Sequence, residues 1–454
     1  MNDTEMEKWL AERFRAAPNP EPSERLQQVV DADRIRAGAP RRWTMPGRAL
    51  GLSGRRPVLA GLVGLAATAI LAAGLLTVVA SRLTQTSLGP GGIEWQPSTQ
   101  VSGFTFTFGP YLASAGGRLY LVGSIAGLGG SSSTEVWSSA DGASWERVSK
   151  PGTFEKYGPG FFPQGFSGDG QGGLVVVGGV AGGPAWHSSD GRTWTPAQFE
   201  TPALARMAAV AARPGAIVAI GDRRVPIPDS ATVSGQTANQ MYAWFSADGT
   251  TWSQVVLPDS LGYVPRAITA WKGGFTAVAD KEVAAAWASS VWTSADGRTW
   301  EKVPQELTFS PIAMVALGDR VVTVGARLDS KLGMVPASWS STDGRKWTES
   351  TASARDRATM FDDVAVVGDT LVAFGSSHMV QSQPAGGPAS TTPPTPPESV
   401  WISSDGATWR LLAEDSSLNF GFYLNTHVTG FGGRVVVATQ GASAVKVLLG
   451  DLVP

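Results

Sequence analysis

One nine-residue pattern occurs six times in this chain and constrains its fold more than any other feature. A Trp begins each copy, a Ser stands two residues before an Asp-Gly pair, and a second Trp lies three residues after the Gly. Asp-Gly between short apolar runs indicates a tight hairpin, because Gly tolerates positive φ and Asp can bond the amides of its own turn. The copies begin at Trp137, Trp186, Trp244, Trp292, Trp339 and Trp401.

A second kind of hairpin precedes each copy and occurs once more near the C-terminus. It is an apolar run bent at a small-residue pair, as in GGLVVVGG from Gly172. A combined unit of about 50 residues is in the range of propeller blades, which bury their faces only by stacking on one another. The seven hairpins of this kind begin at Gly116, Gly172, Pro214, Gly273, Gly318, Gly368 and Gly432.

The seventh unit lacks one strand, and a segment far upstream can supply it. After Gly432 the sequence offers a single further strand at 444–449, whereas Ile93-Glu94-Trp95 resembles the missing fourth strand with its Trp in place. Borrowing that segment would close the circle and leave fewer sheet edges exposed. The sequence therefore predicts an all-β, seven-bladed β-propeller over residues 93–454.

The Asp-Gly hairpins resemble Asp-boxes, also called BNR repeats, of the sialidase and sortilin type of β-propeller. The usual box has one residue between Asp and Gly, so these copies match a shortened variant. In that family the box is a fold signature on the face opposite the ligand site. The resemblance implies a non-catalytic member in which the box acids are structural, namely Asp141, Asp190, Asp248, Asp296, Asp343 and Asp405.

The composition of the chain excludes several kinds of functional site. The chain has no Cys, which excludes disulfides, thiolate zinc sites and a cysteine nucleophile. Its 3 His residues are not at ligand spacing, so we expect no metal. We also expect no cofactor, because phosphate-binding glycine loops and the GxSxG and HExxH patterns are absent. The net charge of -2 gives no reason to expect a nucleic-acid partner.

The segment before the propeller has the pattern of a membrane anchor. Seven Arg and no acid occupy 34–56, and 57–80 then runs 24 residues without a charge, which is long enough to span a bilayer. The Arg excess places the N-terminus in the cytoplasm. We therefore expect a cytosolic tail (1–56), a transmembrane helix (57–80), a linker (81–92) and an extracytoplasmic propeller on a bacterial-type cell membrane. A cleaved signal peptide is the alternative.

Part of the cytosolic tail is expected to be helical. Thr4 and Glu7 have capping-box spacing, and Met6, Leu10 and Phe14 form an apolar stripe. One interpretation is a tail with transient helices, and the other is an amphipathic hairpin that docks a cytosolic partner.

Connection length separates the two faces of the predicted ring. Tight turns and Asp-Gly hairpins share one face, whereas every long connection lies on the other, where a rigid scaffold carries recognition. Two links on that face hold aromatic residues that could stack on sugar or peptide, Phe154 with Tyr157 and Phe420 with Tyr423. The alternative is that these rings plug the ends of blades.

An enzymatic interpretation follows from the family resemblance alone. In sialidases three Arg hold a carboxylate, and a Tyr paired with an acid is the nucleophile. The matching candidates here are three arginines expected just before first strands, Arg206, Arg266 and Arg357, and two residues expected in neighbouring links, Tyr263 and Glu306. The family's early Arg-Ile-Pro motif is absent and sialidases have six blades, so ordinary surface arginines are the alternative.

These patterns favour a membrane-anchored, extracytoplasmic propeller that binds a ligand or protein as a sensor or scaffold. Its partner would be an extracytoplasmic protein or glycan, and the topology is similar to that of membrane-bound anti-sigma factors. A sialidase-like glycoside hydrolase and an envelope assembly factor are the alternatives.

Overall fold

The computed structural model describes residues 92–453, except 98, 102–107, 127–131, 155–160, 180–183, 201–205, 228–236, 282–287, 330–332, 351–359, 377–397, 416–425 and 441–443. The chain divides into two units, Met1–Arg82 and Leu83–Pro454, and all described residues belong to the second. The predicted cytosolic tail (1–56) and transmembrane helix (57–80) lie outside the described residues. Within the described part, no helix is long and apolar enough to cross a membrane.

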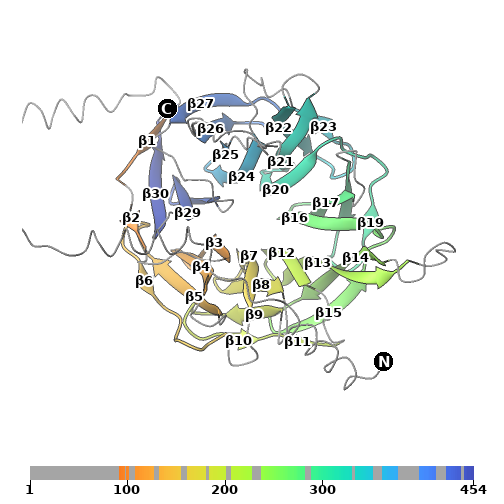
Figure 1. Cartoon of the computed structure of the whole chain (residues 1–454), viewed down its shortest axis with the longest axis horizontal. Helices are drawn as coiled ribbons and strands as arrows, with labels where there is room; N and C mark the ends of the chain where they lie inside the picture. Colours follow the sequence, from red (N-terminus) through yellow and green to blue (C-terminus); the bar gives the residue numbers. More distant parts are fainter. Residues whose placement is uncertain are drawn as a thin grey trace, which may run out of the picture. The chain divides into compact units, whose positions relative to one another are not determined.

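Strand pairing divides the described residues into seven sheets, the blades of a β-propeller (Figure 1). The first blade holds β3 (Phe108–Ala115), β4 (Arg118–Ala126), β5 (Ser132–Ser139) and β6 (Glu146–Arg147). The second holds β7 (Phe162–Gly168), β8 (Leu174–Gly179), β9 (Ala185–Ser188) and β10 (Thr195–Pro196). The third holds β12 (Arg206–Arg213), β13 (Ala216–Pro226), β14 (Thr237–Ser246) and β15 (Thr251–Val256), with β11 (Gln198–Phe199) parallel to β15.

The remaining blades follow the same plan. The fourth holds β16 (Tyr263–Trp271), β17 (Gly274–Lys281), β18 (Ser289–Ser294) and β19 (Glu301–Lys302). The fifth holds β20 (Ser310–Leu317), β21 (Arg320–Asp329), β22 (Gly333–Ser341) and β23 (Thr348–Glu349). The sixth holds β24 (Met360–Val367), β25 (Thr370–Ser376), β26 (Glu398–Ser403) and β27 (Arg410–Asp415). The seventh holds β28 (Thr426–Phe431), β29 (Arg434–Gln440), β30 (Val445–Leu452), β1 (Ile93–Trp95) and β2 (Thr99–Gln100).

The blades form a closed ring. The first strand of each blade is innermost, and these strands contact one another in the order β3, β7, β12, β16, β20, β24, β28 and back to β3 (Figure 1). This arrangement confirms the predicted seven-bladed, all-β propeller.

The predicted N-terminal closing strand is also confirmed. Ile93, Glu94 and Trp95 of β1 pair antiparallel with Leu452, Asp451 and Gly450 of β30, respectively. Trp95 packs edge-on against Phe374 of the sixth blade, with ring centroids 6.0 Å apart. The seventh blade is thus built from both ends of the described chain.

The apolar core lies in the seams between blades rather than inside one blade. Successive residues of a strand point to opposite faces, so one strand serves two seams. In β4, Leu119 and Leu121 join a cluster with the seventh blade, whereas Tyr120 and Val122 join a cluster with the second. Seven such clusters occupy the seven seams of the described ring.

The six Asp-Gly turns share one set of hydrogen bonds. In the first, the Ser139 hydroxyl donates to Asp141 Oδ1 (3.0 Å) and accepts the Gly142 N–H (2.8 Å). Asp141 Oδ1 also accepts the N–H groups of Ala143 and Ser144 at 2.9 and 2.8 Å. These N–H groups hold the pKa of Asp141 below its usual value. The other five acids accept the equivalent pair of N–H groups, namely Asp190, Asp248, Asp296, Asp343 and Asp405.

The Gly of each turn also packs directly on the preceding blade. Gly297 has φ +79°, and a Cβ placed on it would lie 2.5 Å from Cγ2 of Val218. Four of the equivalent glycines are as tightly placed, with a nearest neighbour at 2.3 to 2.6 Å, whereas Gly344 has 3.0 Å. Only glycine satisfies both demands, a left-handed backbone and contact across a seam. The turns therefore join blades as well as strands.

Candidate functional site: the axial mouth

β-Bulges interrupt six of the seven innermost strands near their N-terminal ends. In β16, for example, the register shifts between Pro265 and Ala267, which leaves Arg266 as the extra residue. A bulge re-aims the side chain of its extra residue and is frequent beside functional sites. The shifts in the other five strands fall at 108–111, 163–165, 207–209, 311–313 and 361–363.

Proline explains where several of these bulges form. Pro110, Pro163, Pro265 and Pro311 each lie at a register shift. Proline has no N–H to donate to the ladder, so within sheets it is confined to strand starts, edges and bulges. The bulges therefore recur at the same level around the ring.

The bulged ends enclose a cavity of about 500 Å³, here called the axial mouth. Six innermost strands contribute to it, from β3 to β24, and these strands surround the centre of the ring (Figure 1). The lining residues are Tyr111, Gln164, Arg206, Ala208, Pro265, Arg266, Ser310, Pro311, Ile312 and Met360. Four of them are bulge residues, Gln164, Ala208, Arg266 and Ile312.

Two arginines bring positive charge to the mouth, and each is restrained by a carboxylate of its own blade. Arg206 Nε donates to Asp222 Oδ1 at 2.7 Å, and Arg266 Nε donates to Asp280 Oδ2 at 2.8 Å. Both arginine side chains remain 43% to 46% exposed. Because Nε makes the ion pair, the outer nitrogens of each guanidinium can still bind a ligand.

In the ion pair of the fourth blade, Asp280 is more buried than Arg266. Burial raises its pKa, and the ion pair with Arg266 and the hydroxyl of Ser310, 3.0 Å from Oδ2, offset that only in part. Ser310 therefore ties the fourth blade to the fifth at the rim of the mouth.

The seventh blade approaches the mouth through His427. Its ring lies against that of Tyr111, with centroids 4.6 Å apart, and its Nδ1 lies 3.3 Å from Oδ2 of Asp363. Asp363 is fixed in turn, because Oδ2 accepts the Val428 N–H and Oδ1 accepts the Val364 N–H, both at 2.8 Å. Burial raises the pKa of Tyr111 to about 12, so its hydroxyl stays neutral.

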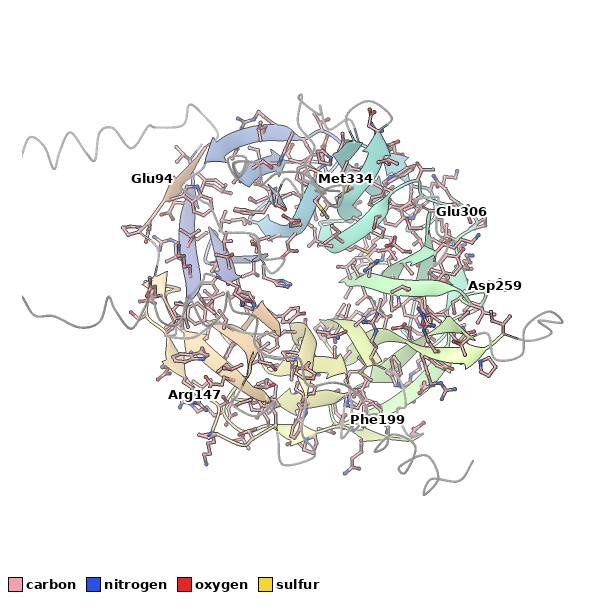
Figure 2. All side chains as sticks on the ribbon, viewed as in Figure 1. Glu94, Arg147, Phe199, Asp259, Glu306 and Met334 are labelled. Carbon is pink, nitrogen blue, oxygen red and sulfur yellow. The ribbon has the colours of Figure 1, made fainter. Side chains whose placement is uncertain are left out.

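The residues expected for a sialidase-like set do not gather in one place. Arg206 and Arg266 meet in the mouth, the first at the start of β12 and the second inside β16 rather than before it. Tyr263 begins β16 instead of lying in a link, and it is not among the lining residues. Glu306 lies between β19 and β20, at the outer edge of the ring in Figure 2, and Arg357 is outside the described residues.

The Tyr263 hydroxyl is used within the fourth blade. It accepts a hydrogen bond from Lys302 Nζ at 2.9 Å and one from Ser290 Oγ at 3.3 Å. Burial alone would raise its pKa, but Lys302, Ser290 and Lys281 together lower it. Only 4% of Tyr263 is exposed, which places its chemistry inside the blade.

Of the four aromatic link residues expected to bind a ligand, Phe154 alone lies among the described residues. Phe154 is 1% exposed and packs on Phe161, Trp186 and Trp194 in the seam between the first two blades. It therefore plugs a blade end instead of offering a binding surface. Tyr157, Phe420 and Tyr423 lie outside the described residues.

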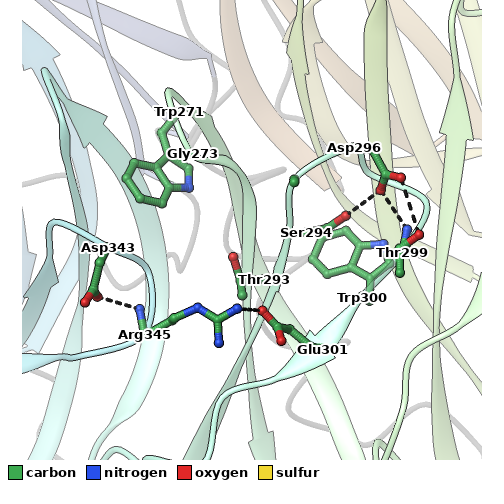
Figure 3. A pocket seen from close by; sticks show the side chains of 11 residues that line it. Trp271, Gly273, Thr293, Ser294, Asp296, Thr299, Trp300, Glu301, Asp343 and Arg345 are labelled. Carbon is green, nitrogen blue, oxygen red and sulfur yellow. Dashed lines mark hydrogen bonds and ion pairs between the residues drawn. The ribbon is translucent and has the colours of Figure 1, made fainter.

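A second cavity of about 380 Å³ lies between the fourth and fifth blades, on the face of the Asp-Gly turns (Figure 3). Its acids Asp296 and Asp343 accept N–H groups of their own turns, and Arg345 forms an ion pair with Glu301 across the seam. Gly344, whose contact is looser than those of the other turn glycines, lies at this seam. We therefore regard this cavity as a structural gap. In the described ring, no group of three His, Asp or Glu residues could hold a metal.

Sequence reasoning found the two arginines but missed Gln164, Ser310, Ile312 and Met360. The available signal was a Pro near the start of four first strands, one residue before Tyr111, Gln164, Arg266 and Ile312. A Pro there predicts a bulge, and hence a side chain directed to the axis.

Comparisons with known proteins identify no family for this chain. No protein-family model matches the chain, and no curated protein matches it. Three similar solved structures have a TM-score of 0.44 each. "YCF48 bound to D1 peptide" is 16% identical and covers 79% of this chain and 96% of that one. A protein of unknown function from Dyadobacter fermentans is 12% identical, and the match covers 80% of this chain and 99% of that one. The β-propeller domain of the Trilobed protease from Pyrococcus furiosus is 10% identical, and the match covers 77% of this chain and 95% of that one.

Proposed function

We propose that this chain is a membrane-anchored, extracytoplasmic binding module whose axial mouth recognises an acidic group of a protein or glycan. The observation that carries the proposal is the pair Arg206 and Arg266, two half-exposed guanidiniums held by Asp222 and Asp280 in one cavity. Arg forms strong, oriented hydrogen bonds with carboxylates. Gln164 and Ser310 add neutral polar groups beside them.

Binding is favoured over catalysis because the mouth offers recognition groups on a rigid frame. Each arginine is already oriented by its carboxylate, so less side-chain entropy is lost when a ligand binds. The Asp-Gly turns lie on the other face, and their hydrogen bonds support the proposal that they are structural Asp-boxes of the shortened kind. They have no part in the ligand site.

The test is binding of a fluorescent tetra-aspartate peptide to the purified full chain in detergent, followed by anisotropy. Changing Arg266→Gln should weaken binding roughly tenfold or more, because hydrogen bonds to charged groups contribute about 1.5 to 3 kcal/mol. The matched control is Arg192→Gln, an arginine on the turn face that also pairs with an acid, Glu146. Equal loss in both variants, or equal binding of a tetra-lysine peptide, would contradict the proposal.

A sialidase-like hydrolase is the second candidate, and the meeting of Arg206 and Arg266 is the one observation in its favour. Hydrolysis also needs a nucleophile beside the clamp, and Tyr263 is committed to Lys302 and Ser290. We expect the full chain to leave a fluorogenic sialoside intact. Turnover that disappears in Arg266→Gln and Tyr263→Phe would promote this candidate to first place.

The location of the module rests on the sequence of 34–80. An Arg-rich segment followed by an uncharged run supports a single span with the N-terminus in the cytoplasm and the propeller outside. Protease added to intact spheroplasts should remove an epitope fused at Pro454 and spare one at Met1. The opposite pattern would place the mouth inside the cell. An envelope assembly role is compatible with the same topology and would show as a partner retained by the mouth.

A further inference from the structure

His427 brings a titratable side chain of the seventh blade next to the axial mouth. It contacts Tyr111, which lines the mouth, and its side chain is 34% exposed. Its Nδ1 side faces Asp363, whose carboxylate is anchored by the backbone N–H groups of Val364 and Val428. The carboxylate therefore holds the imidazole in place beside the mouth.

The groups that face His427 differ in whether their charge can change near neutral pH. β24 presents Asp363 and carries Asp362 beside it, and β3 presents Tyr111, whose pKa is raised by burial to about 12. From β29 the paired residue is Ala438, which has no charge. The remaining charges of the mouth are Arg206 and Arg266 with their acids Asp222 and Asp280. An imidazole is the side chain that ordinarily gains a proton between pH 8 and pH 5.

We propose that His427 is a third, proton-dependent binding group of the axial mouth, which makes the mouth a better site for an acidic ligand below neutral pH. With His427 neutral, the anchored Asp363 leaves a negative charge on this side of the cavity. Protonation of His427 cancels that charge and adds a donor beside Tyr111. This inference rests on the function proposed above, because it concerns the affinity of the same site for an anion.

The experiment measures tetra-aspartate binding to the full chain at pH 8.0 and at pH 6.0, a range in which aspartate keeps its charge. Wild type should bind roughly three- to tenfold more tightly at pH 6.0, as expected for one added charge near the site. His427→Gln, which is uncharged at both pH values, should lose this ratio. His427→Asn serves as a second variant if the first unfolds.

The matched control is His187→Gln. His187 also faces an acid, with Nε2 2.9 Å from Asp169 Oδ2, but it lies under an Asp-Gly turn and against Gly249. This variant should keep the wild-type ratio. A ratio that is unchanged in His427→Gln, or lost equally in His187→Gln, overturns the inference. Binding that depends on Arg266 without any pH effect overturns this inference alone. Binding that is insensitive to Arg266→Gln overturns the proposed function itself.

Discussion

Asp363 of the sixth blade accepts a hydrogen bond from the backbone N–H of Val428 in the seventh, across 2.8 Å. The position follows the bulge of β24, and at the equivalent position β12, β16 and β20 carry Ala209, Ala267 and Ala313. β28 pairs with β29 without a register shift, unlike the other innermost strands. An acid here therefore joins two blades that differ in backbone register.

Replacing Asp363→Ala should lower the free energy of unfolding by about 2 to 4 kcal/mol, because two buried N–H groups lose their acceptor. Denaturant unfolding of the full chain gives the value. The control Asp369→Ala removes an exposed acid from the turn after β24 and should change stability by less than about 0.5 kcal/mol. Similar losses in the two variants would show that Asp363 does not join the blades.

Two glycines with the same backbone conformation separate strain from packing. Gly117 has φ +72° with nothing within 4 Å of a Cβ, whereas Gly297 has φ +79° and would meet Val218 at 2.5 Å. Gly117→Ala should cost about 1 to 2 kcal/mol, the cost of a left-handed backbone. Gly297→Ala should cost roughly 1 to 3 kcal/mol more, because the seam must open. Equal costs in thermal or denaturant unfolding would remove the seam contact from the explanation.

Deleting Ile93 to Gln96 should open the seventh blade. Ile93 is 4% exposed, and Trp95 contacts Phe374, so the loss of both side chains removes about 3 kcal/mol or more of burial. The thermal unfolding midpoint should fall, and a dye that reports apolar surface should bind. Glu94→Ala, which changes the exposed residue of the same strand, is the control and should leave both measurements unchanged.

The turn acids predict a loss of stability at low pH. Burial alone would raise the pKa of Asp248, but the N–H groups of Thr251 and Thr250 and the hydroxyls of Thr250 and Ser246 lower it to about 2. A carboxylate whose pKa is lowered by folding stabilises the protein above its unfolded pKa of about 4. That stability is lost as pH falls from about 4 through about 2. Asp248→Asn should flatten the decline in unfolding free energy over this interval, and an unchanged slope would argue against it.

The repeat made most of the ring predictable. Each Asp-Gly pair marks a turn by its own chemistry, and Ile93 with Trp95 kept the pattern of the strand missing after Gly432. Because these signals are local, the pattern recognised in one copy identifies the other copies. The prediction of blade number followed from counting them.

The site was harder to predict because it depends on register. The sequence marks Arg266 as a blade-start arginine, but only the bulge after Pro265 shows where its side chain is directed. In the sequence, Phe154 looks the same as an aromatic residue that binds a ligand. Its burial against Trp186 depends on how two blades pack, which the sequence does not show directly. Asp363 and His427 are in contact although they lie 64 positions apart in the sequence (427 − 363), and no sequence motif connects them.

The closing strand fixes the order in which this molecule can be completed during synthesis. Gln96 and Asp451, which share a hydrogen bond in the seventh blade, are 355 positions apart. At about 5 to 20 residues per second, a ribosome needs roughly 20 to 70 s to make the chain between them. For that time Ile93 and Trp95 have no partner strand, and six blades can form while the ring stays open. The first described strand, β1, is thus among the last to be paired, and a nascent chain carries it as an unpaired apolar strand until β30 emerges.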